Sequence, residues 1–467
     1  MKAIKHLVIT SSLALGLAGS ALANTTVIVH IVGAPAFRQP VNDAIETIVE
    51  GFAGAGLTAS SAPNPLPAVG NRTTNSTIEG AKANQWLIPN FQSGIDLEIN
   101  ASYTGSTAGV ESVASQVRSQ KFIADGTGTV ASPLGGESAS TVVNPDVNWI
   151  ANSDTFQDST LFTGTQTFYG AARSGSPFTY TFQTLTADLG NSPGGVEVYH
   201  WVASPNAPSD FTNITTAQAK LLYTKGSLPL AFFTGNSADE STTVYALSRD
   251  PGSGARTIAL AEIGVQPAGT NSPINSYVPT ITSGSGVIDG EGSYVGGTIT
   301  AIAQAPAGQI PSTGIYEAAG DTGYASFGTT TNGGSTADSA TSSNNYGLLQ
   351  AVTATPPSGA IFVTYLDNDD TNEALAAGNS YAGASAKLLT YNGVAAGTTD
   401  GADDHAVAEG EYTFWSYESF LAPSGQSSTS QAFETQLEAA FPQFSTLPFN
   451  DLNVSRTTDG GPLSPNY

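Results

Sequence analysis

The chain contains no cysteine and few basic residues. Of 467 residues, 14 are Lys or Arg and 38 are Asp or Glu, which gives a formal net charge of −24. Without cysteine the fold has no disulfides, so its stability must come from burial and hydrogen bonding, which a chain of this length can supply. Such a negative charge repels nucleic acid and anionic membranes, and we expect neither as a partner. Any anion site must then be a local positive region.

Long apolar runs are absent except near the N-terminus. A short basic segment is followed by an apolar run at 7–19, which is too short to span a membrane, and by Ala-Leu-Ala at 21–23. This order is typical of a cleaved signal peptide, so we predict that residues 1–23 are removed. No lipid-bearing cysteine follows. We therefore expect a periplasmic or secreted protein with no membrane anchor.

Motifs of enzymes and metal sites are also scarce. Beyond the signal peptide the histidines are His30, His200 and His405, which are far apart and lack metal-ligand spacing. Residues 190–194 read Gly-x-Ser-x-Gly but precede an expected strand, whereas a hydrolase nucleophile lies between a strand and a helix. The acidic run at 367–373 lacks the glycine and closing glutamate of a calcium loop. The sequence predicts no enzyme activity, no metal and no cofactor.

A glycine-rich segment has the pattern of an anion-binding turn. It reads Arg-Asp-Pro-Gly-Ser-Gly-Ala-Arg at 249–256 and lies between an expected strand at 242–247 and an expected helix at 255–263. Ser253 then precedes the helix, where unpaired N–H groups and the helix dipole favour an anion. Arg249 can add a forked donor. On these residues alone, a plain connector with a solvated arginine is an equal alternative.

Two earlier units have the same strand–turn–helix order. The first has a β-branched strand at 25–32, and the second has an alternating strand at 97–103 followed by a Gly/Ser/Thr turn at 104–109. Repeated units of this kind predict an α/β fold, and such sheets bind ligands at the carboxyl ends of their strands. By themselves, Thr107 can be a plain helix cap and Asp154 an ordinary turn residue.

These segments, with others in the same order, resemble the periplasmic phosphate-binding proteins of ABC importers. The resemblance extends over nearly the whole mature chain. The matching segments are 32–38, 103–109, 150–154, 249–254, 364–366, 387–394 and 409–415.

The resemblance implies a two-lobed type II periplasmic binding protein fold with two hinge crossings. Lobe 1 would comprise residues 24–199 and 361–467, and lobe 2 residues 200–360. The apolar strands at 195–203 and 361–366 would be the crossings. The stretch at about 266–358 is rich in Gly, Ser and Thr and has little apolar periodicity, so we expect an insertion in lobe 2.

The resemblance also implies a set of ligand-binding residues. Thr107 would donate a hydroxyl from lobe 1, and Asp154 would accept the proton of a protonated oxyanion. From lobe 2, Arg249 and Ser253 would supply charge and a hydroxyl, beside the Gly254 N–H. A carboxylate in an anion site disfavours a ligand without a proton, and so selects phosphate over sulfate.

The resemblance implies three further ligand positions, and the chain departs from the family at two of them. The resemblance places Ala36, Phe37 and Ala255 at the ligand, but the turn at 34–36 reads Ala-Pro-Ala where the family has Ser or Thr, and Ala255 replaces a Thr. Hydrogen bonds to charged groups contribute roughly 1.5–3 kcal/mol each, so the missing hydroxyls would weaken binding.

Two functions of different classes follow. The first is that of a monomeric binding protein that captures inorganic phosphate or a related oxyanion and delivers it to the membrane subunits of an ABC transporter. The alternative is a secreted or cell-surface interaction protein with the same fold and a degenerate ligand site. The ordered series of matching segments favours the binding protein, while the missing hydroxyls, the insertion and the strong negative charge are the reasons to keep the alternative.

Overall fold

The computed structural model describes the chain from residue 24 to residue 466, with gaps. The described residues are 24–54, 83–103, 105–117, 120–122, 141–169, 177–187, 194–265, 274–281, 287–288, 293–294, 299–309, 315–324, 348–375, 386–397, 404–444, 447 and 449–466. The predicted signal peptide, residues 190–193 and several stretches of the predicted insertion lie outside them. Among these residues, no helix has both the length and the apolar character needed to cross a membrane.

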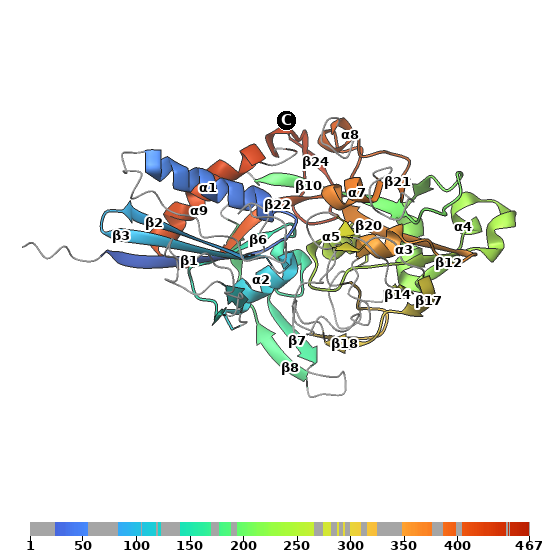
Figure 1. Cartoon of the computed structure of the whole chain (residues 1–467), viewed down its shortest axis with the longest axis horizontal. Coiled ribbons are helices and arrows are strands. Elements are labelled where there is room, and N and C mark those ends of the chain that lie inside the picture. Colours follow the sequence, from blue (N-terminus) through green and yellow to red (C-terminus); the bar gives the residue numbers. More distant parts are fainter. Residues whose placement is uncertain are drawn as a thin grey trace, which may run out of the picture.

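The first half of the main sheet is built around β1, whose β-branched sequence favours a strand. β1 lies between β3 and β6, parallel to both, and β2 pairs antiparallel with β3 (Figure 1). The strands are β1 (Thr25–Gly33), β2 (Ala83–Gln92), β3 (Ile95–Tyr103) and β6 (Trp149–Ser153). The last five residues of β1 and all of β6 are buried.

Three helices cover this first half. The helices are α1 (Arg38–Gly54), α2 (Ser106–Ser115) and α9 (Ser428–Ala440). Residues of α1 and α9 share one hydrophobic cluster with Val29 and Ile31, while α2 packs with Val32. Because neighbouring residues of a strand point to opposite faces, α1 and α9 cover one face and α2 covers the other.

The second half of the sheet has β20 at its centre, parallel to β13 and antiparallel to β10. Its strands are β10 (Gly195–Ala203), β11 (Asn213–Ile214), β12 (Ser227–Pro229), β13 (Thr243–Ala246), β20 (Ala360–Asp367) and β21 (Lys387–Tyr391). Its helices are α3 (Thr216–Lys225), α5 (Gly254–Glu262), α6 (Leu348–Thr353) and α7 (Asn368–Leu375). Helices α3 and α5 contribute to one hydrophobic cluster, and α6 and α7 to another.

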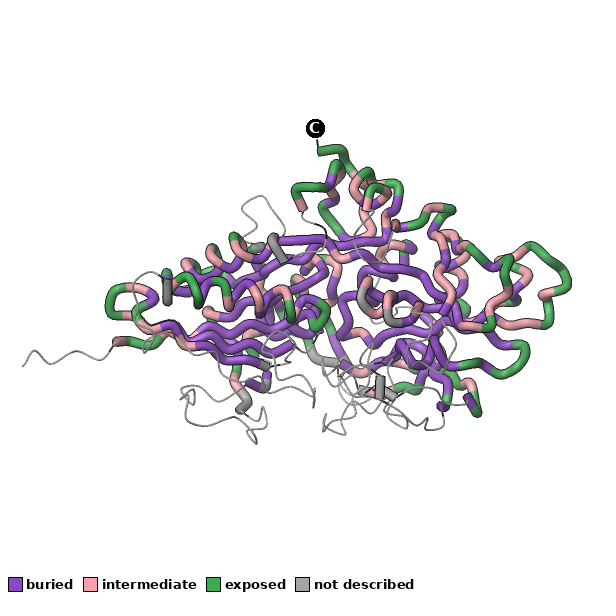
Figure 2. The backbone as a smooth tube through the Cα atoms, turned by 45° about the horizontal axis from the view of Figure 1, so that its top comes forward, coloured by how far each residue is buried: buried purple, intermediate pink, exposed green. Residues whose placement is uncertain are grey.

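Two long strands join the halves. The start of β10 pairs with β22 (Trp415–Pro423), whereas its end pairs with β20. β22 continues onto β6, so the hydrogen-bonded path runs from β12 to β2 without a break. The buried backbone accordingly extends through both halves (Figure 2).

The remaining elements are short strands and short helical turns, and one of these strands, Leu185–Ala187, pairs with β22 of the main sheet. The strands are β4 (Gln120–Phe122), β5 (Thr141–Val143), β7 (Thr165–Tyr169), β8 (Pro177–Thr181), β9 (Leu185–Ala187), β14 (Tyr277–Ile281), β15 (Val287–Ile288), β16 (Ser293–Tyr294), β17 (Ile299–Gln304), β18 (Gly308–Gln309), β19 (Tyr316–Glu317), β23 (Val454–Ser455) and β24 (Ser464–Pro465). The helical turns are α4 (Ala231–Thr234), α8 (His405–Ala408), η1 (Gln157–Ser159), η2 (Ser237–Ser241), η3 (Phe441–Phe444) and η4 (Phe449–Asp451).

The predicted α/β class is confirmed: a large mixed sheet carries helices on both faces. The lobe boundaries and the hinge crossings stay predictions. Among the described residues, 360–367 pair with β10 and β13, and the hydrogen-bonded connection to β6 is made by β22. A buried apolar strand has the same sequence pattern wherever it pairs. The pattern therefore could not show which strand connects the second half of the sheet to β6.

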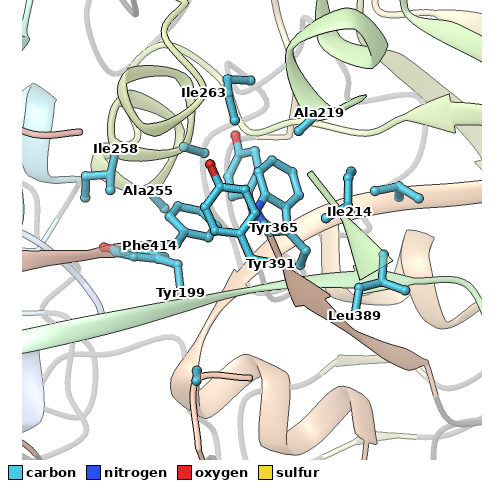
Figure 3. Packing of buried hydrophobic residues seen from close by; sticks show 14 of the residues in the cluster. Tyr199, Ile214, Ala219, Ala255, Ile258, Ile263, Tyr365, Leu389, Tyr391 and Phe414 are labelled. Carbon is cyan, nitrogen blue, oxygen red and sulfur yellow. The ribbon is translucent and has the colours of Figure 1, made fainter. Parts of the chain in front are cut away.

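Aromatic side chains fill the core of the second half. The ring of Trp201 on β10 lies 5.2 Å from that of Phe414, 5.7 Å from that of Tyr223 and 5.9 Å from that of Tyr365. Figure 3 shows Tyr365, Tyr391 and Phe414 gathered beside Ala255 and Ile258 of α5. The start of α5 is therefore held by this aromatic core.

We expect Trp201→Ala to lower the free energy of unfolding by about 3–5 kcal/mol, because it leaves a cavity among these rings. Urea unfolding followed by circular dichroism measures the loss. Phe232→Ala is the control, since Phe232 is 45 % exposed and its removal should change stability by less than about 0.5 kcal/mol. Similar losses for the two variants would contradict this description of the core.

Candidate functional site

The carboxyl ends of β1, β3 and β6 meet at one point. The Ala34 N–H donates to the carbonyl of Asn152 at 3.0 Å, and the Gly105 N–H donates to that of Gly33 at 2.9 Å. Gly33 has a φ of +146°, and a Cβ there would lie 1.7 Å from the Asn152 carbonyl oxygen. Only glycine fits this contact. The turns that follow the three strands are thereby brought together.

The α2 turn faces the glycine-rich loop of the second half. Thr107 is buried in the first turn of α2, and its hydroxyl donates to the Pro251 carbonyl at 3.3 Å. A Cβ at Gly105 would lie 2.8 Å from the Gly252 carbonyl oxygen. The predicted turn at 104–109 and the glycine-rich loop therefore lie against each other, although 144 residues separate Thr107 from Pro251.

The glycine-rich loop leads into α5 as the sequence predicted. Ser253 is the N-cap, and its hydroxyl oxygen accepts from the Arg256 N–H at 3.4 Å. Both Ser253 and Gly254, the first residue of the helix, are buried. Their position puts the positive end of the α5 dipole at the junction between the two halves.

Asp154 lies directly opposite the start of α5. Its Oδ2 accepts from the hydroxyl of Tyr199 on β10 at 2.9 Å. Its Oδ1 is buried and has no hydrogen-bond partner among the described residues. A Cβ at Gly254 would lie 1.7 Å from this Oδ1, so the carboxyl group touches the helix start. A buried acceptor thus faces the helix N-terminus.

Burial raises the pKa of Asp154. The nearby Ser106 hydroxyl, the Tyr199 hydrogen bond and the positive charge of Arg249 act in the opposite direction, because each favours the ionised carboxylate. Arg249, the predicted cation, therefore lies within electrostatic range of Asp154.

The two arginines of the loop have different contacts. Arg249 is buried, and its Nε donates to the Tyr324 carbonyl at 3.1 Å. Arg256 forms an ion pair of 2.8 Å with Asp321 and donates to the Arg249 carbonyl at 3.0 Å. Arg256 therefore stabilises the loop through the segment 321–324. This segment belongs to the predicted insertion, which thus helps to build the site.

The three remaining predicted positions lie differently. Ala36 is exposed. The Phe37 ring packs in the core of the first half, 6.0 Å from the ring of Phe441. Ala255 is buried in the aromatic core of the second half. A contact of Phe37 or Ala255 with an anion could come only from the backbone, and their roles stay predictions.

No sequence pattern indicates that segment 454–465 takes part in the site. Asp459 accepts from the Phe156 N–H at 2.9 Å, two residues after Asp154. Arg456 lies 4.0 Å above the Trp415 ring and 3.5 Å from Glu262 at the end of α5. Burial raises the pKa of Asp459 to about 7. This segment therefore ties the Asp154 turn to α5.

Comparisons with known proteins give only distant likenesses. No family model matches the chain, and no curated protein matches it. An ABC-type phosphate transport receptor from Vibrio cholerae is 9 % identical with a TM-score of 0.35, over 89 % of this chain and 96 % of that one. PstS from Borrelia burgdorferi is 8 % identical with a TM-score of 0.29, over 87 % and 91 %. Scores this low carry no weight for the function of this chain.

The contact at Gly254 can be tested by adding one methyl group. We expect Gly254→Ala to lower the free energy of unfolding by about 1–3 kcal/mol, because the new Cβ would overlap Asp154 Oδ1. Gly51→Ala is the matched control. Gly51 lies in α1 with nothing within 4 Å of an added Cβ, so alanine should stabilise the protein by about 0.5–1 kcal/mol. Equal effects in urea unfolding would refute the contact.

Proposed function

We propose that this chain binds a protonated oxyanion, phosphate or a close chemical relative, beside the point where Asp154 meets the start of α5. The observation that carries the proposal is the buried Asp154 Oδ1, which has no hydrogen-bond partner among the described residues. Leaving such an acceptor unpaired costs about 1–3 kcal/mol. A ligand hydroxyl supplies the missing proton.

The surroundings of Asp154 support an anion with that proton. The N-terminus of α5 favours negative charge through its N–H groups and its dipole. Arg249 adds a positive charge close enough to act on the Asp154 carboxyl. The carboxylate repels an anion that lacks a proton, such as sulfate, so the combination selects phosphate or arsenate.

Thr107 and Ser253 complete the proposed site. In the structure the Thr107 hydroxyl donates to the Pro251 carbonyl, and the Ser253 oxygen accepts from the Arg256 N–H. Both groups are buried beside the α5 start. A hydroxyl can both donate and accept, so each can turn to a ligand oxygen without leaving its place.

The proposed biological role is that of a monomeric, exported binding protein that delivers the oxyanion to ABC transporter membrane subunits. This step rests on the ordered sequence resemblance. The second candidate is an interaction protein that keeps the fold with a degenerate site. The pairing of Arg256 with Asp321 favours it, since this arginine cannot then replace the hydroxyls missing at 34–36 and at Ala255.

Phosphate should stabilise the native protein by about 4 kcal/mol at 1,000 times its dissociation constant, which raises the melting temperature by a few degrees. Scanning fluorimetry with phosphate, arsenate, sulfate and molybdate measures the shift.

Arg249→Ala should weaken phosphate binding at least about tenfold, measured by calorimetry, because it removes a charged donor. Asp154→Asn should weaken phosphate and relax the rejection of sulfate, since an amide can donate.

Lys220→Ala is the matched control for Arg249→Ala. It removes the same charge from an exposed side chain that contacts the Gly264 carbonyl. Its phosphate affinity should equal that of the unaltered protein. If none of the four oxyanions changes the melting temperature, oxyanion binding is refuted and the interaction protein remains.

A further inference from the structure

Glu418 is a second buried carboxyl near the site, and the proposed function does not use it. It lies on β22, opposite Gly195 of β10, at the point where the sheet passes from one half to the other. The next residue, Ser419, pairs with Ser153 of β6, one residue before Asp154. The Glu418 side chain is fully buried.

Glu418 forms a hydrogen bond with Asn152. Asn152 Nδ2 donates to Glu418 Oε1 at 2.5 Å, and both residues are fully buried. The other two polar atoms of the pair, Glu418 Oε2 and Asn152 Oδ1, are buried without a partner among the described residues. If Glu418 were ionised, both atoms would be acceptors with no donor. Each buried, unpaired acceptor would then destabilise the folded state.

One proton on Glu418 Oε2 would give both Glu418 Oε2 and Asn152 Oδ1 a hydrogen-bond partner. A protonated Oε2 is a donor, and the Asn152 Oδ1 is an acceptor on the group that already donates to Oε1. A carboxylic acid and an amide can then form two hydrogen bonds in one ring.

We propose that Glu418 is a neutral carboxylic acid that donates its proton to Asn152 Oδ1 and so fixes the end of β6 that carries Asp154. The backbone of Asn152 supports this positioning role, since its carbonyl accepts from the Ala34 N–H. Glu418 thereby connects β22 to the turns after β1 and β6 without touching the ligand.

The groups around Glu418 favour the neutral form. Burial raises the pKa of Glu418 well above its usual range, and the negative charges of Asp154 and of Glu197 on β10 raise it further. The Asn152 hydrogen bond acts against them. Tyr103 on β3 also lies within range of Glu418, with Arg38 of α1 beside that tyrosine. The neutral form leaves Asp154 without a second negative charge next to it.

The substitution Glu418→Gln tests the proposal without any ligand. A glutamine donates to Asn152 Oδ1 and accepts from its Nδ2, as a protonated glutamate does. Above the ordinary pKa of 4.5, unfolding releases the Glu418 proton, so the unaltered protein loses stability as pH rises towards the raised folded pKa. Glu418→Gln lacks this loss. Its unfolding constant relative to the unaltered protein should therefore fall about tenfold per pH unit in that window.

Two variants and one spectrum complete the test. Glu418→Leu cannot pair with Asn152 and should be less stable than Glu418→Gln at every pH. Glu197→Gln removes the neighbouring carboxyl and should keep the infrared band of the protonated Glu418 carboxyl. The infrared spectrum of the unaltered protein near neutral pH should contain a protonated-carboxyl band that Glu418→Gln lacks.

The proposal is overturned if that band is absent, or if Glu418→Gln is as unstable as Glu418→Leu at every pH. Both readouts use the full chain without oxyanion. A failure of phosphate binding therefore leaves the protonation of Glu418 to be decided separately by these measurements.

Discussion

Asp154 and Gly254 touch where the two halves of the sheet face each other, and the organisation of the site depends on that contact. The carboxyl can lie there only because residue 254 has no side chain and because Tyr199, on the joining strand β10, holds its other oxygen. The same contact places a buried acceptor at the N-terminus of α5. This contact therefore requires glycine at 254 and is oriented by the Tyr199 hydrogen bond. It also lies in the field of the α5 dipole, which favours an anion.

The scarcity of basic residues explains how the loop is supported. With a net charge of −24, the chain keeps its anion turn in place with two buried arginines that bind mainly backbone carbonyls and one carboxylate. Three of the partners, Asp321, Thr322 and Tyr324, lie within the stretch that the sequence marked as an insertion. The buried carboxyls Asp154, Glu418 and Asp459 all have raised pKa values, because burial disfavours their charged forms.

Local patterns predicted the elements well. The β-branched run at 25–32 forms β1, the apolar run at 195–203 forms β10, and the segment expected as a helix from 255 to 263 forms α5 from Gly254 to Glu262 with Ser253 as its cap. These features depend on side-chain shape and on capping within a few residues, which a sequence displays directly. The order of the turns also indicated which of them would converge.

By itself, the sequence determined the α/β class, the strand–turn–helix units and the glycines at the turns, because each depends on residues close together in the chain. Only the tertiary structure decided that β22 joins the halves, that Tyr199 orients Asp154, that Glu418 pairs with Asn152 and that Asp459 holds the Phe156 N–H. In the last two pairs about 270 and 300 residues separate the partners. A buried glutamate in an apolar strand gives no local signal of its partner, since the partner is chosen by strand order and register.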